Sequence, residues 1–177
     1  MIPRTLQLGG PRLRLEPVVE DMLGPEYLAW LNDPQVTRFS NQRWRTHTVD
    51  SARAYLASFE GTSNRFLAVY LAADDRMIGT MTAYISEAHG TADMGLMIGD
   101  RSCWGQGYGL EAWSTLMGHL LGPLALRKVT GGCVRGNVGM RIIMERSGMQ
   151  LEAVRQRQEI VDGVEQDVLY FARFRDS

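Results

Sequence analysis

One stretch in the middle of the chain constrains the fold more than any other. Residues 91–121 run from an apolar strand pattern through the glycine loop Trp-Gly-Gln-Gly-Tyr-Gly at 104–109 into an amphipathic helix. Glycines let backbone N–H groups approach a ligand closely, and a helix start adds partial positive charge. The stretch therefore has the features of a phosphate-binding loop, although a glycine-rich turn is also found as a plain tight connection.

Two other nucleotide-binding patterns fit this loop poorly. The phosphate loop of nucleotide hydrolases ends in Gly-Lys-Ser/Thr, whereas this loop continues Gly109-Leu110-Glu111. A dinucleotide-binding fold would place an acidic residue at the end of the next strand. Here that strand is expected at residues 128–134 and is followed by Arg135. A dinucleotide-dependent enzyme therefore stays only as a weak alternative.

Composition and charge describe an ordinary globular chain. The 177 residues are 45% hydrophobic and 22% charged, which favours a single domain spanning residues 1–177. A net charge of −1 argues against a nucleic-acid partner. The apolar runs are too short for a membrane span, and the first ten residues lack the apolar core of a signal peptide. We expect no membrane partner and a cytoplasmic location.

Cysteine and histidine usage predicts neither a disulfide nor a metal site. Cys103 and Cys133 are expected to be free thiols in the cytoplasm, and the three histidines are too scattered to bind a metal. Cys103 adjoins the glycine loop, but no histidine partner can be argued for it. A nucleophilic role for Cys103 is therefore not favoured.

The residues before the glycine loop predict a strand, two helices and then a meander. Alternating residues 13–16 predict a first strand, Asp21 is expected to cap a first helix that stops at residues 32–34, and Thr48 to cap a second. The buried face of the second helix would carry Ala52, Tyr55, Leu56 and Phe59. Three antiparallel strands should follow at residues 65–71, 77–85 and 91–98.

The residues after the loop complete an α+β fold. The helix-containing crossover predicts that residues 128–134 lie parallel to residues 91–98. A helix should begin near Asn137 and end at Gly148, and Asp162-Gly163 predicts a hairpin between residues 151–161 and 164–174. We expect a mostly antiparallel central sheet, splayed at one parallel junction and flanked by helices. The splay would leave unpaired backbone groups in a cleft.

These motifs resemble a known family. The run at residues 104–112, the order of elements, and Asn137 followed by Gly148-Met149 are similar to the GNAT superfamily of acyl-CoA-dependent N-acetyltransferases. The Trp-Gly-x-Gly loop and residues 30–34, Trp-Leu-Asn-Asp-Pro, resemble the RimJ/RimL-type branch. Trp104 stands where many members carry Arg or Gln. The resemblance covers nearly the whole chain, from Leu13 to about Phe174.

The resemblance implies acetyl-CoA as cosubstrate, with no metal. Backbone amides of residues 105–109 would hold the pyrophosphate, and the main chain near Ile98 would pair with pantetheine and polarise the thioester carbonyl. Asn137 would contact pantetheine or a nearby water, and it would also cap a helix. The implied coenzyme-binding residues are Met97, Ile98, Gly99, Trp104, Gly105, Gln106, Gly107, Tyr108, Gly109 and Asn137.

The resemblance implies direct transfer of the acetyl group to a primary amine, which needs a proton acceptor. Asp93 occupies the place of the family's strand carboxylate, so Asp93 and Asn137 are the implied catalytic residues; a solvent-facing carboxylate is the alternative for Asp93. Positions that carry a tyrosine or a serine in relatives are Met144 and Met140 here. The general acid is therefore open, with Tyr108, Tyr170 or water as candidates.

The acceptor is implied only by class: a small amine such as an amino sugar or nucleotide-linked amine, or a protein N-terminus. Residues 36–46 predict either a ligand-contacting loop or a solvated connection. Their arginines would suit a phosphate. The expected substrate-binding residues are Arg38, Asn41, Arg43, Glu87 and His89. A non-catalytic acyl-CoA-binding regulatory module is the alternative function, and the family also allows a homodimer.

Overall fold

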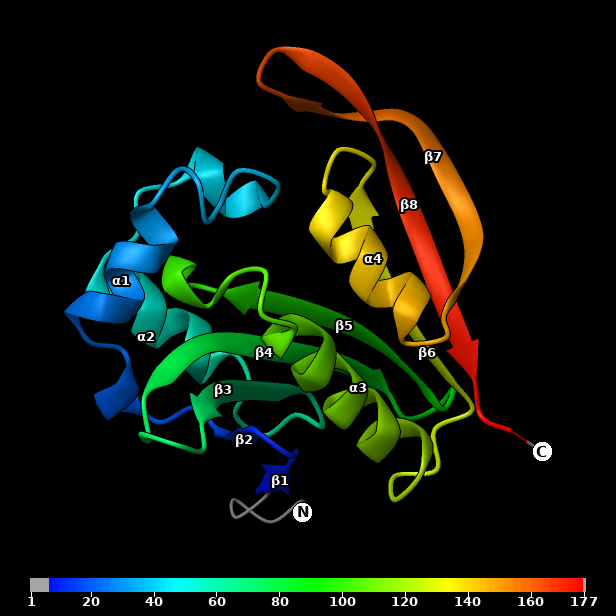
Figure 1. Cartoon of the computed structure of the whole chain (residues 1–177), viewed down its shortest axis with the longest axis horizontal. Coiled ribbons are helices and arrows are strands. Elements are labelled where there is room, and N and C mark those ends of the chain that lie inside the picture. Colours follow the sequence, from blue (N-terminus) through cyan, green and yellow to red (C-terminus); the bar gives the residue numbers. More distant parts are fainter. Residues whose placement is uncertain (1–6, 177) are drawn as a thin grey trace.

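The computed structural model describes residues 7–176. Figure 1 shows a curved sheet with helices on both faces. The strands are β1 (Leu8–Gly9), β2 (Leu13–Pro17), β3 (Arg65–Leu71), β4 (Met77–Ser86), β5 (Thr91–Ile98), β6 (Lys128–Val134), β7 (Gln150–Val161) and β8 (Val164–Phe174). The α-helices are α1 (Pro25–Asn32), α2 (Val49–Ala57), α3 (Tyr108–Leu121) and α4 (Val138–Arg146), and the 3-10 helices are η1 (Glu20–Met22), η2 (Asn41–Trp44) and η3 (Arg101–Cys103).

All eight strands belong to one sheet in the order β1-β2-β3-β4-β5-β6-β8-β7. Neighbours are antiparallel except β5 and β6, which run parallel from the pair Thr91 and Lys128 to the pair Met94 and Gly131. This confirms the expected α+β sheet with one parallel junction. Beyond Met94 and Gly131 the two strands have no further paired residues, so β5 keeps an open edge toward its end.

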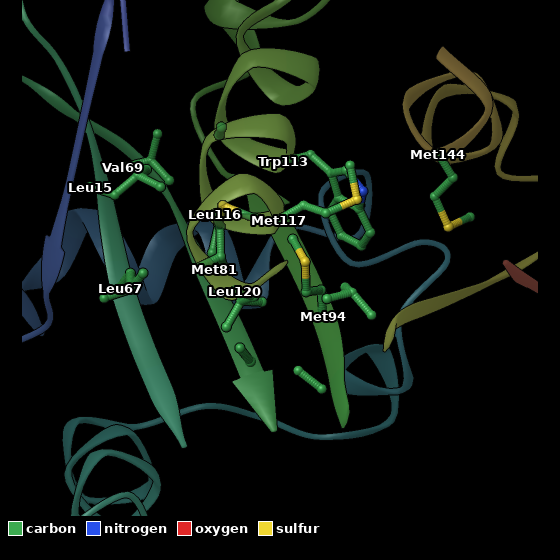
Figure 2. Close-up of a cluster of buried hydrophobic side chains, with 14 of the residues drawn as sticks. Leu15, Leu67, Val69, Met81, Met94, Trp113, Leu116, Met117, Leu120 and Met144 are labelled. Carbon is green, nitrogen blue, oxygen red and sulfur yellow. The ribbon is translucent and has the colours of Figure 1, made fainter. Parts of the chain in front are cut away.

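The main core lies between α3 and one face of the sheet. Figure 2 shows Trp113, Leu116, Met117 and Leu120 of α3 above Leu15, Leu67, Val69, Met81 and Met94 of the strands. These side chains are buried because helical spacing and strand alternation direct both sets toward the same layer. A side chain at Gly131 would overlap the Trp113 ring, so this glycine permits the close approach of α3 to β6.

A second core joins α1 and α2 to the opposite face of the sheet. Tyr27 and Trp30 of α1 pack with Phe66 and Ala68 of β3. A side chain at Gly99 would overlap the Trp30 indole. The glycine that ends β5 is therefore a packing position for α1.

The long β7–β8 hairpin extends away from the rest of the sheet, with α4 beside it (Figure 1). The predicted Asp162-Gly163 turn is confirmed, since both residues have positive φ angles, of 51° and 78°. Two irregularities in the β7–β8 register bend the exposed strand. The bend carries the hairpin tip toward the α1–α2 connection, as described below.

Three local expectations were wrong or incomplete. Asp21 does not cap the first helix: it lies inside η1, and α1 begins at Pro25 after Gly24, because proline is favoured in the first turn of a helix. Helix α2 ends at Ala57, so Phe59 packs from the following turn. Strand β1 carried too short a pattern to be recognised, since it contains only Leu8 and Gly9.

Candidate active site

The glycine loop between η3 and α3 adopts the conformation that its glycines allow. Gly105 and Gly107 have φ angles of 72° and 82°, and Gly107 is the N-cap of α3. The first helical bond runs from the Glu111 N–H to the Gly107 carbonyl, at 3.1 Å. The N–H groups of residues 108–110 therefore have no partner within the helix. A fourteen-residue helix with a free first turn is a suitable site for a pyrophosphate.

Arg12, just before β2, holds this loop in place, and no short-range pattern in the sequence indicates this role. Its main-chain N–H and its Nε donate to the two carboxylate oxygens of Glu111, at 2.7 and 2.8 Å. Its Nη1 donates to the Gln106 carbonyl at 3.0 Å, and its guanidinium lies over the Tyr108 ring. Because these partners are nearly a hundred residues away in sequence, only the fold brings them together.

Gln106 turns back into its own loop, since its Nε2 donates to the Ser102 carbonyl at 2.6 Å. The predicted coenzyme residues Trp104, Gly105, Gly107, Tyr108 and Gly109 line a cavity, whereas Gln106 is not among its lining residues. Gln106 thus shapes the loop from behind. Its coenzyme-binding role stays a prediction that rests on its backbone.

The open edge of β5 lies next to the other predicted coenzyme-binding residues, Met97, Ile98 and Gly99. The Gly99 N–H donates to the Ile78 carbonyl in β4, and a side chain at Gly79 would collide with the Met97 carbonyl. Main-chain groups alternate along a strand, so Met97 and Gly99 face β4 while Leu96 and Ile98 face the splay. Of the three predicted residues Met97, Ile98 and Gly99, only Ile98 has its main-chain groups at the open edge. The sequence prediction missed Leu96, because the register of β5 with β4 decides which main-chain groups face the splay.

Asn137 lies at the opposite wall of the splay, at the start of α4. Its Oδ1 accepts from the Met140 N–H at 3.1 Å, so it caps the helix as the sequence predicts. It also lines the cavity. Within residues 7–176 its Nδ2 donates no hydrogen bond, which leaves that group available to a ligand or water.

One cavity of about 1380 Å³ joins these parts. It runs from the glycine loop along residues 94–98 of β5 to the α1–α2 connection. The wall of the cavity next to α1, α2 and β3 carries Tyr27, Tyr55 and Phe66. The sequence pattern had assigned these aromatic side chains only to the core. Burial raises the pKa of Tyr27 to about 12 and raises that of Tyr55 further, so both phenols stay neutral.

Asp93 lies just beyond this lining, on the same sheet face as Gly95 and about 7 Å further along β5. Its Oδ1 accepts a hydrogen bond of 2.6 Å from Oγ1 of Thr130 on β6. Burial raises the pKa of Asp93 above its ordinary value, and the Thr130 hydrogen bond opposes this. By its surface area Asp93 is exposed, so its carboxyl is accessible to solvent although neighbouring groups partly desolvate it.

Three of the predicted substrate residues connect the α1–α2 loop to the β7–β8 hairpin. Arg38 forms an ion pair with Asp162, in which its Nε and Nη2 both contact Oδ2, at 2.9 and 2.8 Å. Arg43 donates to the Ile160 carbonyl at 2.8 Å, and Asn41 lies 3.4 Å from Glu159. These contacts form a strap over one end of the cavity. Of the residues that make these contacts, only Arg38 and Asp162 line the cavity.

Glu87 and His89 lie away from the other predicted site residues. They occupy the turn between β4 and β5, at the end where β5 still pairs with β6. The His89 carbonyl accepts from Arg127 Nε at 2.6 Å, and neither residue lines the cavity. The structure does not bring these two side chains to the open edge of β5.

Both cysteines line the cavity as buried free thiols. Burial raises the pKa of the Cys133 thiol to about 11, and Cys103 lies 3.9 Å from the Arg76 guanidinium. Within residues 7–176 there is no cluster of three or more potential metal ligands. In the same range no helix is long and apolar enough to cross a membrane.

The comparison with protein families agrees with this geometry. The family described as the acetyltransferase (GNAT) domain matches residues 12–150. The chain belongs to this family. The GNAT fold uses acetyl-CoA.

Individual relatives are distant in sequence and close in fold. The probable N-acetyltransferase YjcK of Bacillus subtilis is 25% identical over 127 residues, which are 68% of this chain and 70% of YjcK. RimL, a ribosomal alpha-N-protein acetyltransferase in complex with coenzyme A, has a TM-score of 0.82 at 17% identity, covering 96% of this chain and 98% of RimL. Spermidine N-acetyltransferase from Vibrio cholerae, with coenzyme A and spermine, has a TM-score of 0.82 at 16% identity, covering 94% and 97%.

Proposed function

We propose that this GNAT protein transfers an acetyl group from acetyl-CoA directly to a primary amine. The observation that carries the proposal is the shared cavity, which places the free N–H groups of the α3 start next to the open edge of β5. The two features offer hydrogen-bond donors for a pyrophosphate and a strand edge for the amides of pantetheine. Acetyl-CoA supplies the acetyl thioester, whose C–S bond breaks as the new C–N bond forms.

The protein's own groups would then perform two tasks. N–H groups at the open edge, from Leu96 and Ile98, would polarise the thioester carbonyl. Asp93 would accept the proton that the acceptor's ammonium must lose, directly or through water, since an amine with a pKa near about 10 is protonated at neutral pH. The leaving sulfur would take its proton from water or from Tyr108, which lines the cavity.

We further propose that the acceptor is a small amine with an anionic group, such as a nucleotide-linked amino sugar. Among the described lining residues the charged groups are the guanidinium groups of Arg38, Arg45 and Arg146, against one carboxylate, Asp162. Asp162 is already paired with Arg38. Within residues 7–176 Arg45 has no ion-pair partner. This wall favours a phosphate and disfavours a polycation like the spermine in the Vibrio cholerae structure.

The assignment to the RimJ/RimL-type branch, a cytoplasmic location and a single domain belong to the same proposal. The branch assignment is supported by the Trp-Gly-Gln-Gly loop and by residues 30–34. In the structure Arg101 of η3, which precedes the loop, pairs with Asp33 at 3.4 Å. A homodimer remains one option within the family.

A panel of amines tests the function. Coenzyme A release would be measured with acetyl-CoA and with matched acceptors: an amino sugar and its phosphate ester, a nucleotide-linked amino sugar, a peptide N-terminus and spermidine. Turnover should be highest with the phosphate-bearing amines, and Arg45→Gln should reduce that preference. Arg53→Gln is the matched control, since Arg53 pairs with Glu20 and does not line the cavity. Tight acetyl-CoA binding without turnover on any amine would instead support a regulatory acyl-CoA-binding module.

A further inference from the structure

Trp104 is a half-exposed tryptophan whose single polar atom is committed to the backbone. Its Nε1 donates a hydrogen bond of 2.8 Å to the Ile98 carbonyl, while 44% of the residue surface stays exposed. Both residues line the cavity. A tryptophan at the surface can donate its N–H to water, whereas the bond from Trp104 to the Ile98 carbonyl fixes the indole against β5.

The carbonyl that Trp104 occupies is one of a few open groups. The alternation along β5 directs the main-chain groups of Leu96 and Ile98 toward the splay. With the Ile98 carbonyl taken, the remaining groups there are the Leu96 N–H and C=O and the Ile98 N–H. An extended ligand that pairs with β5 as an added strand therefore meets, at Ile98, the Trp104 indole that already donates to this carbonyl.

The indole is itself held in place. The Trp104 N–H donates to the Arg101 carbonyl at 3.2 Å, which closes η3. The Arg101 guanidinium lies 6.0 Å from the centre of the indole ring, and it pairs with Asp33 at the end of α1. The chain from Ile98 to Trp104 is thus a closed loop with its indole fixed at the end of the open strand edge.

From this arrangement we propose that Trp104 is a positioning residue for pantetheine: it withdraws the Ile98 carbonyl from pairing and so fixes the register in which the pantetheine arm adds to β5. This inference rests on the proposed use of acetyl-CoA. It differs from a phosphate-binding role for Trp104, because the indole N–H points to the strand. Directly after Trp104, Gly105 opens the turn that leads to the pyrophosphate-binding N–H groups.

The variant Trp104→Phe tests this by removing the N–H while keeping an aromatic ring. Loss of one hydrogen bond to the backbone should raise the Kd of acetyl-CoA about fivefold. The KM of acetyl-CoA should rise in proportion, with the KM of the amine unchanged. Binding of 3′-phosphoadenosine 5′-diphosphate, which has the pyrophosphate and lacks pantetheine, should be unaltered. Without ligand, the melting temperature should match that of the parent protein.

Trp44 provides the control variant. It is 68% exposed, lies against Arg43 and does not line the cavity. Acetyl-CoA should change the tryptophan fluorescence of the parent protein and of Trp44→Phe equally. The change should be smaller in Trp104→Phe, where Trp113 is the tryptophan left along the described cavity lining.

Two results with Trp104→Phe would overturn the inference: unchanged affinity for acetyl-CoA, or an equal loss of affinity for acetyl-CoA and for the pantetheine-free ligand. The second would make Trp104 a support for the phosphate loop alone. Failure of the parent protein to bind acetyl-CoA would overturn the proposed function together with this inference. The two failures are distinguishable, because failure of the inference is observed with Trp104→Phe and failure of the proposed function is observed with the parent protein.

Discussion

Thr130 and Asp93 lie opposite each other across the parallel pair β5–β6, and Oγ1 of Thr130 donates a hydrogen bond of 2.6 Å to Oδ1 of Asp93. The pair sits where the two strands are about to separate, since the last paired residues are Met94 and Gly131. The proposed role of Asp93 as proton acceptor depends on this placement at the base of the splay.

Asp93→Asn should lower the turnover rate by about 10²- to 10⁴-fold at neutral pH, because general-base catalysis contributes on that scale. The Kd of acetyl-CoA should stay unchanged, since Asp93 does not line the cavity that holds the coenzyme site. Steady-state kinetics and calorimetric binding measure the two quantities. An unaltered rate would remove Asp93 from the mechanism.

The same carboxyl sets a pH dependence. Burial raises the pKa of Asp93 and the Thr130 hydrogen bond lowers it. The base must be ionised, so the rate should fall as the pH drops through this raised pKa. Thr130→Val removes the donor and should move that acidic limb to higher pH, whereas Thr130→Ser should leave it in place. A limb at the same pH in Thr130→Val would show that the hydroxyl does not act on the base.

Protein stability should report the raised pKa of Asp93 independently of activity. A pKa above the unfolded value means that the neutral carboxyl favours folding. That contribution is complete below the ordinary value of 3.8 and is lost as the pH rises through the folded pKa. The parent protein should therefore gain stability relative to Asp93→Asn as the pH falls. Thermal melts of both proteins across mildly acidic pH measure this difference; a constant difference would contradict the shift.

The two arginines of the strap should differ in their effect on stability. Arg43 is 12% exposed in its side chain and donates to the Ser40 and Ile160 carbonyls, so Arg43→Met should lower the free energy of unfolding by about 2 kcal/mol. Arg38 and Asp162 are both more than half exposed, so Arg38→Gln should cost less than about 1 kcal/mol. Urea denaturation measures both changes, and equal losses would contradict this distinction.

Gly99→Ala should act on packing. A methyl group there would overlap the Trp30 indole, and overpacking of this kind costs about 1–3 kcal/mol. Affinity for acetyl-CoA should stay the same in the folded protein, because the Gly99 N–H is bonded to β4. Urea denaturation and a binding titration separate the effects. A loss of affinity for acetyl-CoA with an unchanged free energy of unfolding would contradict this account and support a coenzyme-binding role for Gly99.

Much of the fold could be predicted because its signals are local. The short turns that separate β3, β4 and β5, the helical spacing after the glycine loop and the Asp162-Gly163 turn each depend on neighbouring residues. The parallel junction followed from the length of the crossover alone. The start of α1 was misplaced because Asp21 and Pro25 are competing local start signals, and tertiary packing of Tyr27 and Trp30 selects between them.

The site was predictable only where one segment carries it. The glycine loop is continuous in sequence, whereas its brace, Arg12, is nearly a hundred residues away from Glu111. Likewise, Leu96 is distinguished from Met97 only by the register with β4. Arg38 and Arg43 were predicted to contact a ligand because no short-range sequence pattern indicates their partners in the β7–β8 hairpin. Such pairings depend on the tertiary fold.

Acetyl transfer itself is the central claim, and mass spectrometry of the acceptor tests it most directly. The purified protein would be incubated with acetyl-CoA and a nucleotide-linked amino sugar, with Asp93→Asn as the parallel reaction. We predict that the acceptor gains one acetyl group on its amine, with stoichiometric release of coenzyme A, and that Asp93→Asn gives far less product. Binding of acetyl-CoA with no acetylated product from this acceptor or any other amine would contradict the account.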